Sequence, residues 1–199
     1  PYGRNFLGTP PQGRADFAFF QHILKSMDPK TGRCAILFPH GVLFREEEKS
    51  LREALIKLDV LECVIGVAKG LFYNSPMEAC IVICNNSKPS ELKGKVRFID
   101  AKKEYVKSGN NSMLTIDNIS KIKNAFVSFD EIPGFMSIIV NDQLLENDSK
   151  LSIASNVSDG IEEQECSVQE AFDLWQVSKN RHDAQTNNLM IHCRGHNDE

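Results

Sequence analysis

Two apolar stretches that follow one another closely limit the possible folds of this chain more than any other feature. Residues 61–67 and 79–84 are predominantly apolar and are predicted as strands, and only eleven residues separate them. Strands of this kind are covered on both faces, as in the sheets of α/β proteins. A parallel return normally needs a helical crossover of about a dozen residues or more. The connecting stretch contains Gly70 and Pro76, so the sequence predicts an antiparallel hairpin that joins the two strands.

Helices and strands alternate in the part of the chain before this hairpin. Residues 34–38 form a continuous apolar run between Gly32 and Pro39, which predicts another buried strand. Apolar residues recur at helical spacing in residues 16–27 and 51–58, on either side of that strand. The order helix, strand, helix, strand is typical of a doubly wound α/β fold, so we expect a parallel sheet that ends in an antiparallel hairpin strand.

The pattern becomes less regular after residue 88. Residues 96–100, 135–140 and 151–154 are predicted as short strands, and Thr115 can cap a helix between the first two. A capping box at residues 167–170 precedes another helical pattern. The first helix is expected to turn Ile116, Ile119, Ile122 and Phe126 inward, and the second to pack Phe172 and Trp175 on the domain or on a partner. The chain is therefore divided into residues 1–88, residues 89–160 as a small α+β extension, and residues 161–199 as a C-terminal helix and polar tail.

Composition excludes several classes of protein. The chain has 23 Lys and Arg residues and 27 Asp and Glu residues. The resulting net charge of -4 argues against a chain that coats nucleic acid non-specifically. A local basic groove, and hence a DNA enzyme, remains compatible with this charge. No apolar run approaches the ~18 residues of a membrane helix, and the first residues lack the apolar core of a signal peptide. The missing apolar runs predict no membrane contact. None of the six cysteines shows the two-residue gap of a zinc or redox motif, so we also predict a cytoplasmic protein with no metal site.

Several stretches of the sequence resemble a known family. Pro1 and Tyr2, which Gly3 follows, look like the second half of the tetrapeptide Asn/Asp-Pro-Pro-Tyr/Phe of DNA methyltransferases that act on amino groups. The chain as far as residue 157 resembles the modification subunits of type I restriction-modification systems, and its first hundred residues carry nearly all of the specificity. The stretches concerned are residues 13–24 (GRADFAFFQHIL), 39–45 (PHGVLFR), 71–81 (LFYNSPMEACI) and 94–101 (GKVRFIDA). The resemblance implies an α/β fold: the C-terminal half of a Rossmann-like, S-adenosylmethionine-dependent methyltransferase, with the α+β extension added to it.

The resemblance also implies a reaction, the transfer of a methyl group from S-adenosylmethionine to the N6 amino group of an adenine flipped out of the DNA duplex. In the family motif, the Asn side chain and a proline carbonyl accept hydrogen bonds from the amine, and the aromatic residue stacks on the base. Tyr2 corresponds to the stacking residue and Pro1 to the second proline, so both are predicted as catalytic. The sequence has neither the catalytic Asn nor a glycine-rich cofactor turn. We therefore expect the cofactor to be bound mainly by a missing N-terminal half, with no cofactor-binding residue here and no activity for this chain alone.

Five further residues are predicted to lie near the substrate. Phe72 and Tyr73 lie in the link between two strands, where such enzymes often place an aromatic side chain against the flipped base; packing against the sheet is the alternative. His40 lies just past the C-terminal end of a strand, where α/β proteins bind their substrates, although a capping or loop-bracing role is also open. Lys69 and Arg45 are predicted to contact DNA phosphates, with simple solvation as the alternative.

The resemblance implies partners as well. They are double-stranded DNA, a DNA-specificity subunit that supplies sequence recognition and, often, a restriction subunit. This division of labour agrees with an acidic chain, because most DNA contacts can lie on another subunit. One rival function is a non-catalytic assembly module from a truncated or degenerate gene. Another is a methyltransferase of the same fold that acts on RNA or on protein glutamine, and residues 40–45 favour the type I family over it.

Overall fold

The computed structural model describes residues 3–72, 75, 77–109, 111–157, 172, 176 and 179. The chain divides into two compact units, Pro1–Gly160 and Ile161–Glu199. In the second unit, residues 172, 176 and 179 are helical, and Phe172 is 49% exposed. No helix among the described residues is long and apolar enough to cross a membrane. The predictions for Pro1, Tyr2, Tyr73, Trp175 and residues 167–170 lie outside the described residues.

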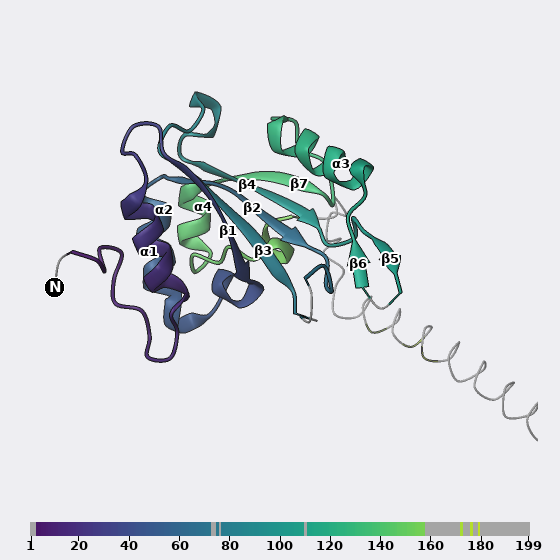
Figure 1. Ribbon diagram of the computed structural model, residues 1–199, viewed down its shortest axis with the longest axis horizontal. Helices are drawn as coiled ribbons and strands as arrows, with labels where there is room; N and C mark the ends of the chain where they lie inside the picture. Colours follow the sequence, from purple (N-terminus) through teal and green to yellow (C-terminus); the bar gives the residue numbers. More distant parts are fainter. Residues whose placement is uncertain are drawn as a thin grey trace, which may run out of the picture. The chain divides into compact units, whose positions relative to one another are not determined.

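A five-stranded mixed sheet forms the centre of the first unit (Figure 1). Its strand order is β1-β3-β2-β4-β7, in which β2 and β4 pair in parallel and the other three pairings are antiparallel. The predicted hairpin between β2 and β3 is confirmed, with Val64 opposite Val82. The strands are β1 (Arg33–Pro39), β2 (Leu61–Val67), β3 (Ala79–Asn85), β4 (Lys95–Ala101) and β7 (Met136–Val140).

The sheet is mostly antiparallel, which differs from the expected parallel arrangement. β1, β2 and β4 do run in the same direction, but β3 returns into the space between β1 and β2. This insertion replaces one parallel pairing with two antiparallel ones. On its other side β2 pairs with β4, so the returning strand lies on the side of β2 that faces β1.

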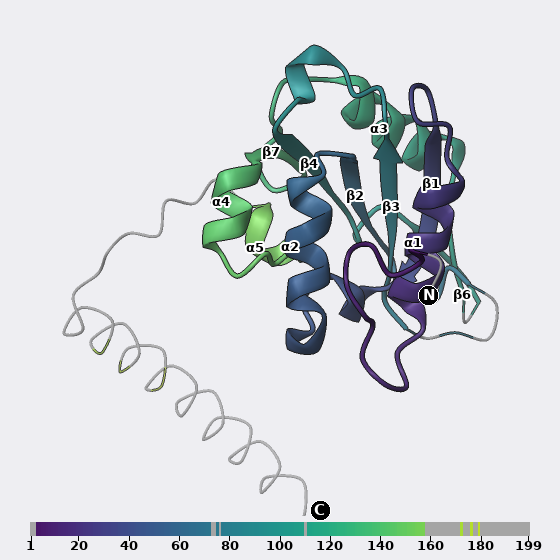
Figure 2. The same ribbon diagram turned by 90° about the vertical axis from the view of Figure 1, so that its left-hand side faces the viewer.

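Helices cover both faces of the sheet. α1 (Asp16–Ser26), α2 (Lys49–Lys57), α4 (Asn141–Glu146) and α5 (Ile153–Asn156) contribute to one hydrophobic cluster, and α3 (Ile116–Val127) contributes to a second. Figures 1 and 2 show α1, α2 and α4 on one side of the strands and α3 on the other. The remaining elements are the 3-10 helices η1 (His40–Leu43), η2 (Glu46–Glu48) and η3 (Ser90–Leu92) and the small hairpin of β5 (Val106–Ser108) and β6 (Asn111–Met113).

One buried amide attaches the N-terminal segment to α1. Gln21 is fully buried, and its Oε1 accepts a hydrogen bond from the Leu7 backbone N–H at 2.8 Å. Its Nε2 donates to the carbonyl of Gly8 at 3.1 Å and to that of Phe17 at 3.2 Å. Phe17 and Phe20 on the same helix are 1% exposed, as the apolar spacing predicted. The polar contacts of Gln21 therefore fix the path of the residues that follow the predicted Pro1–Tyr2 motif.

The prediction of a strand at residues 151–154 was wrong, because Ile153–Asn156 form the short helix α5. Asn156 closes this turn, since its Nδ2 donates to the carbonyls of Ser152 at 2.8 Å and Lys150 at 3.1 Å. Ile153 is fully buried against β2 and β4. The alternating apolar residues Leu151 and Ile153 are compatible with a strand. The side-chain amide of Asn156, however, hydrogen-bonds to nearby backbone carbonyls and favours a turn.

The helix that begins after Thr115 is confirmed, but the face expected to point inward is partly wrong. Thr115 and Asn118 form a capping box, with the Thr115 Oγ1 accepting from the Asn118 backbone N–H at 3.2 Å. Ile122 and Phe126 pack on the core beside the buried Ala125. In contrast, Ile116 is 82% exposed and Ile119 is 52% exposed. Ala125 lies on the face of α3 that meets the sheet, and at about 100° per residue Ile116 falls on the opposite side of the helix.

Candidate functional site

The C-terminal ends of β1, β2 and β4 meet at one edge of the sheet because these strands run in the same direction. His40 follows β1, Lys69 follows β2, and Asp100 lies near the end of β4 opposite Gly66. In α/β proteins this is the edge at which ligands bind. β3 begins at the same edge, because Ala79 pairs with both Pro39 and Val67.

Glu78, immediately before β3, connects two of the predicted site residues. Its carboxylate lies 3.2 Å from Lys69 Nζ and 3.7 Å from His40 Nδ1. The backbone N–H of His40 also donates to the Glu78 carbonyl at 3.1 Å. Burial opposes ionisation of Glu78, but the hydrogen bond from Lys69 and the positive charge of Lys102 lower its pKa overall. The structure thus brings His40 and Lys69 together around a carboxylate that the sequence did not single out.

His40 lies in a setting that favours its neutral form. Only 15% of its side chain is exposed, and its ring meets the edge of Phe44 at 5.6 Å between centroids. Burial and the nearby charge of Lys102 lower its pKa. Its Nε2 is buried and has no hydrogen-bond partner among the described residues. A neutral imidazole can offer one donor and one acceptor, so His40 retains unused hydrogen-bonding capacity at this edge.

The link between β2 and β3 is attached to the small β5–β6 hairpin. Ser112 on β6 donates from Oγ to the carbonyl of Lys69 at 2.6 Å and from its backbone N–H to the carbonyl of Gly70 at 3.0 Å. Gly70 has φ +71°, a conformation that side chains rarely adopt. Phe72 follows and is 37% exposed, with an isolated bridge to Ser75. The link therefore presents Lys69 and Phe72 at the sheet edge, while Tyr73 lies outside the described residues.

Arg45 does not join this cluster. Its Nη1 lies 3.0 Å from Asp16 Oδ2 and 3.5 Å from Glu48 Oε2, and 19% of its side chain is exposed. These ion pairs connect α1 with η2. The guanidinium also lies against Gly41, where an added Cβ would come within 2.8 Å of Arg45 Nε. These contacts brace the loop after β1 and leave the guanidinium little freedom to reach a phosphate.

A second arginine, which the sequence did not single out, stabilises the same loop through hydrogen bonds. Arg52 on α2 is 1% exposed and donates to the carbonyl of Arg45 at 2.7 Å and to that of Val42 at 3.5 Å. Its Nε also donates to the carbonyl of Ser149 at 2.9 Å, across 97 residues of sequence. Only its position on the apolar side of a helix, next to Leu51, could have signalled burial. Arg52 fixes the loop that carries His40.

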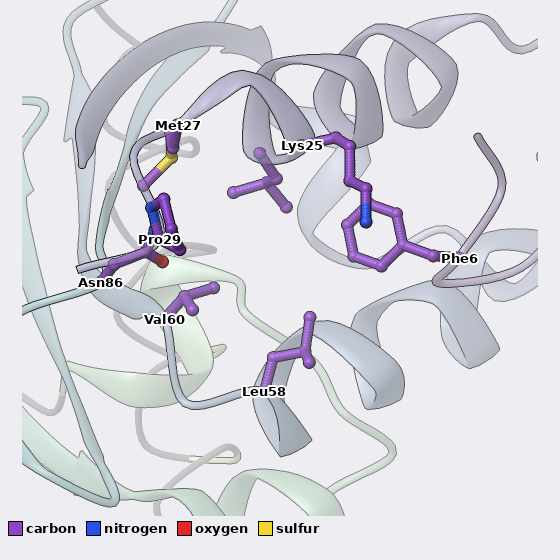
Figure 3. Close-up of a pocket in the computed structure, with 8 residues that line it drawn as sticks. Phe6, Lys25, Met27, Pro29, Leu58, Val60 and Asn86 are labelled. Atoms are coloured by element: carbon purple, nitrogen blue, oxygen red, sulfur yellow. The ribbon is translucent and has the colours of Figure 1, made fainter. Parts of the chain in front are cut away.

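Described residues of the first unit line cavities of about 490 Å³, of which two concern the two edges of the sheet. One, at the opposite edge of the sheet from His40, is mostly apolar, and Lys25 extends over the ring of Phe6 at 5.7 Å (Figure 3). The other begins at the end of β4 and includes Asp100, Glu104 and Lys121. Among the described residues no group of three or more His, Cys, Asp or Glu could hold a metal ion. No glycine-rich turn from a strand into a helix, as a cofactor phosphate or carboxylate would need, occurs among them either.

Comparison with known sequences gives a consistent set of relatives. Residues 2–165 match the family model described as N-6 DNA Methylase. The chain is 32% identical over 170 residues to the type I restriction enzyme MjaVIII methylase subunit of Methanocaldococcus jannaschii, over 83% of this chain and 29% of that protein. It is 34% identical over 131 residues to the type I restriction enzyme HindI methylase subunit of Haemophilus influenzae, over 64% of this chain and 29% of that protein. The chain thus spans 29% of the length of both relatives.

Solved structures give the same result. A type I restriction-modification methyltransferase subunit from Streptococcus thermophilus is 35% identical with a TM-score of 0.69, over 74% of this chain and 31% of that one. The M protein of the type I restriction enzyme EcoKI has a TM-score of 0.61, over 91% of this chain and 45% of that one. The second likeness, at 15% identity, concerns the fold alone.

Proposed function

Because the chain belongs to the N-6 DNA methylase family, we propose that it is the C-terminal part of a type I modification subunit. In this role it would take part in transferring a methyl group from S-adenosylmethionine to the N6 amino group of an adenine flipped out of double-stranded DNA. S-adenosylmethionine supplies the methyl group. The described residues offer no turn that fits this cofactor, so we assign no cofactor contact to this chain, and we expect it to be inactive alone.

The observation that best supports this proposal is the open edge of β1. β1 stands at the end of the strand order, and its outer edge pairs with no strand among the described residues. Leu37 on this strand is 48% exposed. A long apolar edge strand is normally paired or covered, because its free backbone groups otherwise invite association. We infer that further strands of a Rossmann-like catalytic domain add to this edge and bring the cofactor pocket with them.

The sheet edge around Glu78 is the proposed substrate side. Phe72 and Tyr73 would lie against the flipped adenine, where each aromatic platform stabilises an extruded base by ~1–3 kcal/mol. His40 would lie beside the base or the adjoining backbone, with the exposed 15% of its side chain toward the substrate. Lys69 is 68% exposed and would meet a DNA phosphate.

The N-terminal motif and the partners complete the proposal. Tyr2 would stack on the adenine and Pro1 would help to position its amine. The ion pairs of Arg45 favour a bracing role over the DNA contact predicted from the sequence. A net charge of -4 agrees with a DNA-specificity subunit that makes most contacts with DNA, and with a restriction subunit in the same assembly.

The gene sequence gives the first test. We expect Asn-Pro to be encoded immediately before Pro1, with a glycine-rich turn from a strand into a helix upstream of it. An initiator Met or an unrelated sequence at that place would overturn the proposal. As a biochemical counterpart, the 199-residue chain should show no S-adenosylmethionine binding by calorimetry. Micromolar binding would show that the cofactor site is not where we place it.

A methylation assay gives the second test. The protein extended by its upstream sequence and mixed with its specificity subunit should transfer a labelled methyl group to adenine in duplex DNA. Phe72→Ala should reduce this transfer, whereas Phe19→Ala, which removes a 66% exposed aromatic ring from α1, should not. Subunit binding without any transfer would support the rival assembly module. Transfer to RNA or to protein glutamine instead would support the other rival.

A further inference from the structure

Two cysteines lie directly opposite each other on neighbouring strands. Cys34 in β1 pairs with Cys84 in β3 in the antiparallel register, so both side chains point to the same face of the sheet. Both are free thiols, and Cys34 packs against the hydrophobic cluster to which Cys84 belongs. The other two described cysteines are not opposed to a cysteine, because Cys80 pairs with Phe38 and Cys63 with Ile83.

The spacing of an opposed pair is close to what a disulfide needs. Opposite residues in an antiparallel pair have Cα atoms about 4.5–5.5 Å apart, within the range of about 4.4–6.8 Å found for disulfides. Their Cβ atoms lie about 4.5–5.5 Å apart, whereas a disulfide prefers about 3.8 Å, so the strands must approach by about 1 Å. β1 is one of the two edge strands of the described sheet and pairs only with β3 there, so it can make this movement without disturbing a second described pairing. The closed bond would keep some strain, which makes it easy to reduce.

The two thiols are unequal in a way that suits exchange chemistry. Cys34 is partly exposed, whereas Cys84 is fully buried. A hydrogen bond from Cys84 lowers the pKa of Cys34 to about 7, although partial burial opposes ionisation. The same hydrogen bond and burial raise the pKa of Cys84. Burial also raises the pKa of Cys63, and raises that of Cys80 to about 12, which leaves both inert at neutral pH.

We propose that Cys34 and Cys84 form a reversible thiol–disulfide site that reacts with low-molecular-weight disulfides. The Cys34 thiolate attacks one sulfur of the small disulfide, whose S–S bond breaks and releases one thiolate that takes up a proton. Cys84 then gives its proton to solvent and attacks the Cys34 sulfur, which expels the second small thiol. The protein loses two hydrogen atoms and gains one cross-strand disulfide, and the small disulfide is reduced to two thiols.

The test uses the full chain with Cys166→Ser and Cys193→Ser, which removes the two cysteines outside the described residues. This protein is incubated with oxidised glutathione under native conditions and analysed by mass spectrometry and peptide mapping. We expect the loss of two hydrogen atoms, a link between Cys34 and Cys84, and complete reversal by dithiothreitol. A stable glutathione adduct, a link between other cysteines, or no reaction in the folded protein would overturn the proposal.

Single variants separate the two steps. Cys84→Ser should stop after the first step and keep one glutathione on Cys34. Cys34→Ser should not react, because the remaining thiols are buried. Cys63→Ser is the matched control and should form the cross-strand disulfide as the parent protein does. If Cys34→Ser reacted as fast as the parent, the attacking thiol would be a different one and the proposal would fail.

Discussion

Gly66 on β2 lies beneath Ile153 of α5, and this contact leaves no room for a methyl group. A Cβ at Gly66 would lie 2.9 Å from Ile153 Cγ1 and 3.3 Å from Lys102 Cε, against 3.4–4 Å for an ordinary contact. The end of the lysine can move away, but Ile153 is fully buried. Overpacking of a core costs about 1–3 kcal/mol, while replacing Gly by Ala at an ordinary backbone conformation stabilises by about 0.4–1 kcal/mol. We therefore expect Gly66→Ala to lower the free energy of unfolding by about 0.5–2 kcal/mol.

The sign of this effect should reverse when the obstructing side chain is removed. Ile153→Ala alone should cost about 2–5 kcal/mol because it leaves a cavity. In that background, Gly66→Ala should stabilise the protein by about 0.4–1 kcal/mol, because the methyl group now has space. Urea unfolding of the parent, both single variants and the double variant gives the interaction energy, which we expect to be about 1–3 kcal/mol. An equal effect of Gly66→Ala in both backgrounds would refute the packing of α5 on β2.

Three other predictions test the supports of the site and one helix cap. Arg52→Met should lower the free energy of unfolding by about 1–3 kcal/mol, because it leaves the carbonyls of Arg45 and Ser149 without their donor; Lys57→Met, an exposed change on the same helix, should alter it by less than about 0.5 kcal/mol. Similar small effects of both changes in urea unfolding would contradict this role of Arg52. Thr115→Ala should cost about 1 kcal/mol by the same measurement, since it removes one half of a capping box, and an unchanged midpoint would show that the cap is absent. NMR titration should place the pKa of His40 below 6.5, and Lys102→Met should raise it; a value at or above 6.5 in the parent would contradict the burial and charge that we describe. Because the folded-state pKa of His40 is below the unfolded one, its contribution to stability is present above about pH 6.5 and is lost as the pH falls through the folded-state value.

Local patterns were sufficient to predict the elements whose signal lies within a few neighbouring residues. The hairpin of β2 and β3 follows from an eleven-residue link that is too short for a crossover, and α1 and α2 follow from apolar spacing. Errors occurred where a distant contact decides. The turn of α5, which the Asn156 amide closes, also packs Ile153 over Gly66, 87 residues earlier, and no local apolar pattern predicts this contact. Ile116 and Ile119 point outward because Ala125, two turns later, determines which face of α3 contacts the sheet.

The position of β3 explains why the candidate site could be predicted only in part. His40 was singled out because it follows a strand, and Lys69 because it is a basic residue in a loop, and both are local signals. Glu78 was not, because it joins them only if β3 enters between β1 and β2 and begins where those strands end. The same insertion places Cys84 opposite Cys34 at the far end of β1. One topological choice therefore creates both the Glu78 cluster at the proposed substrate edge and the thiol pair at the other, so a crosslink between the thiols would fix the separation of the two strands that position His40 and Glu78.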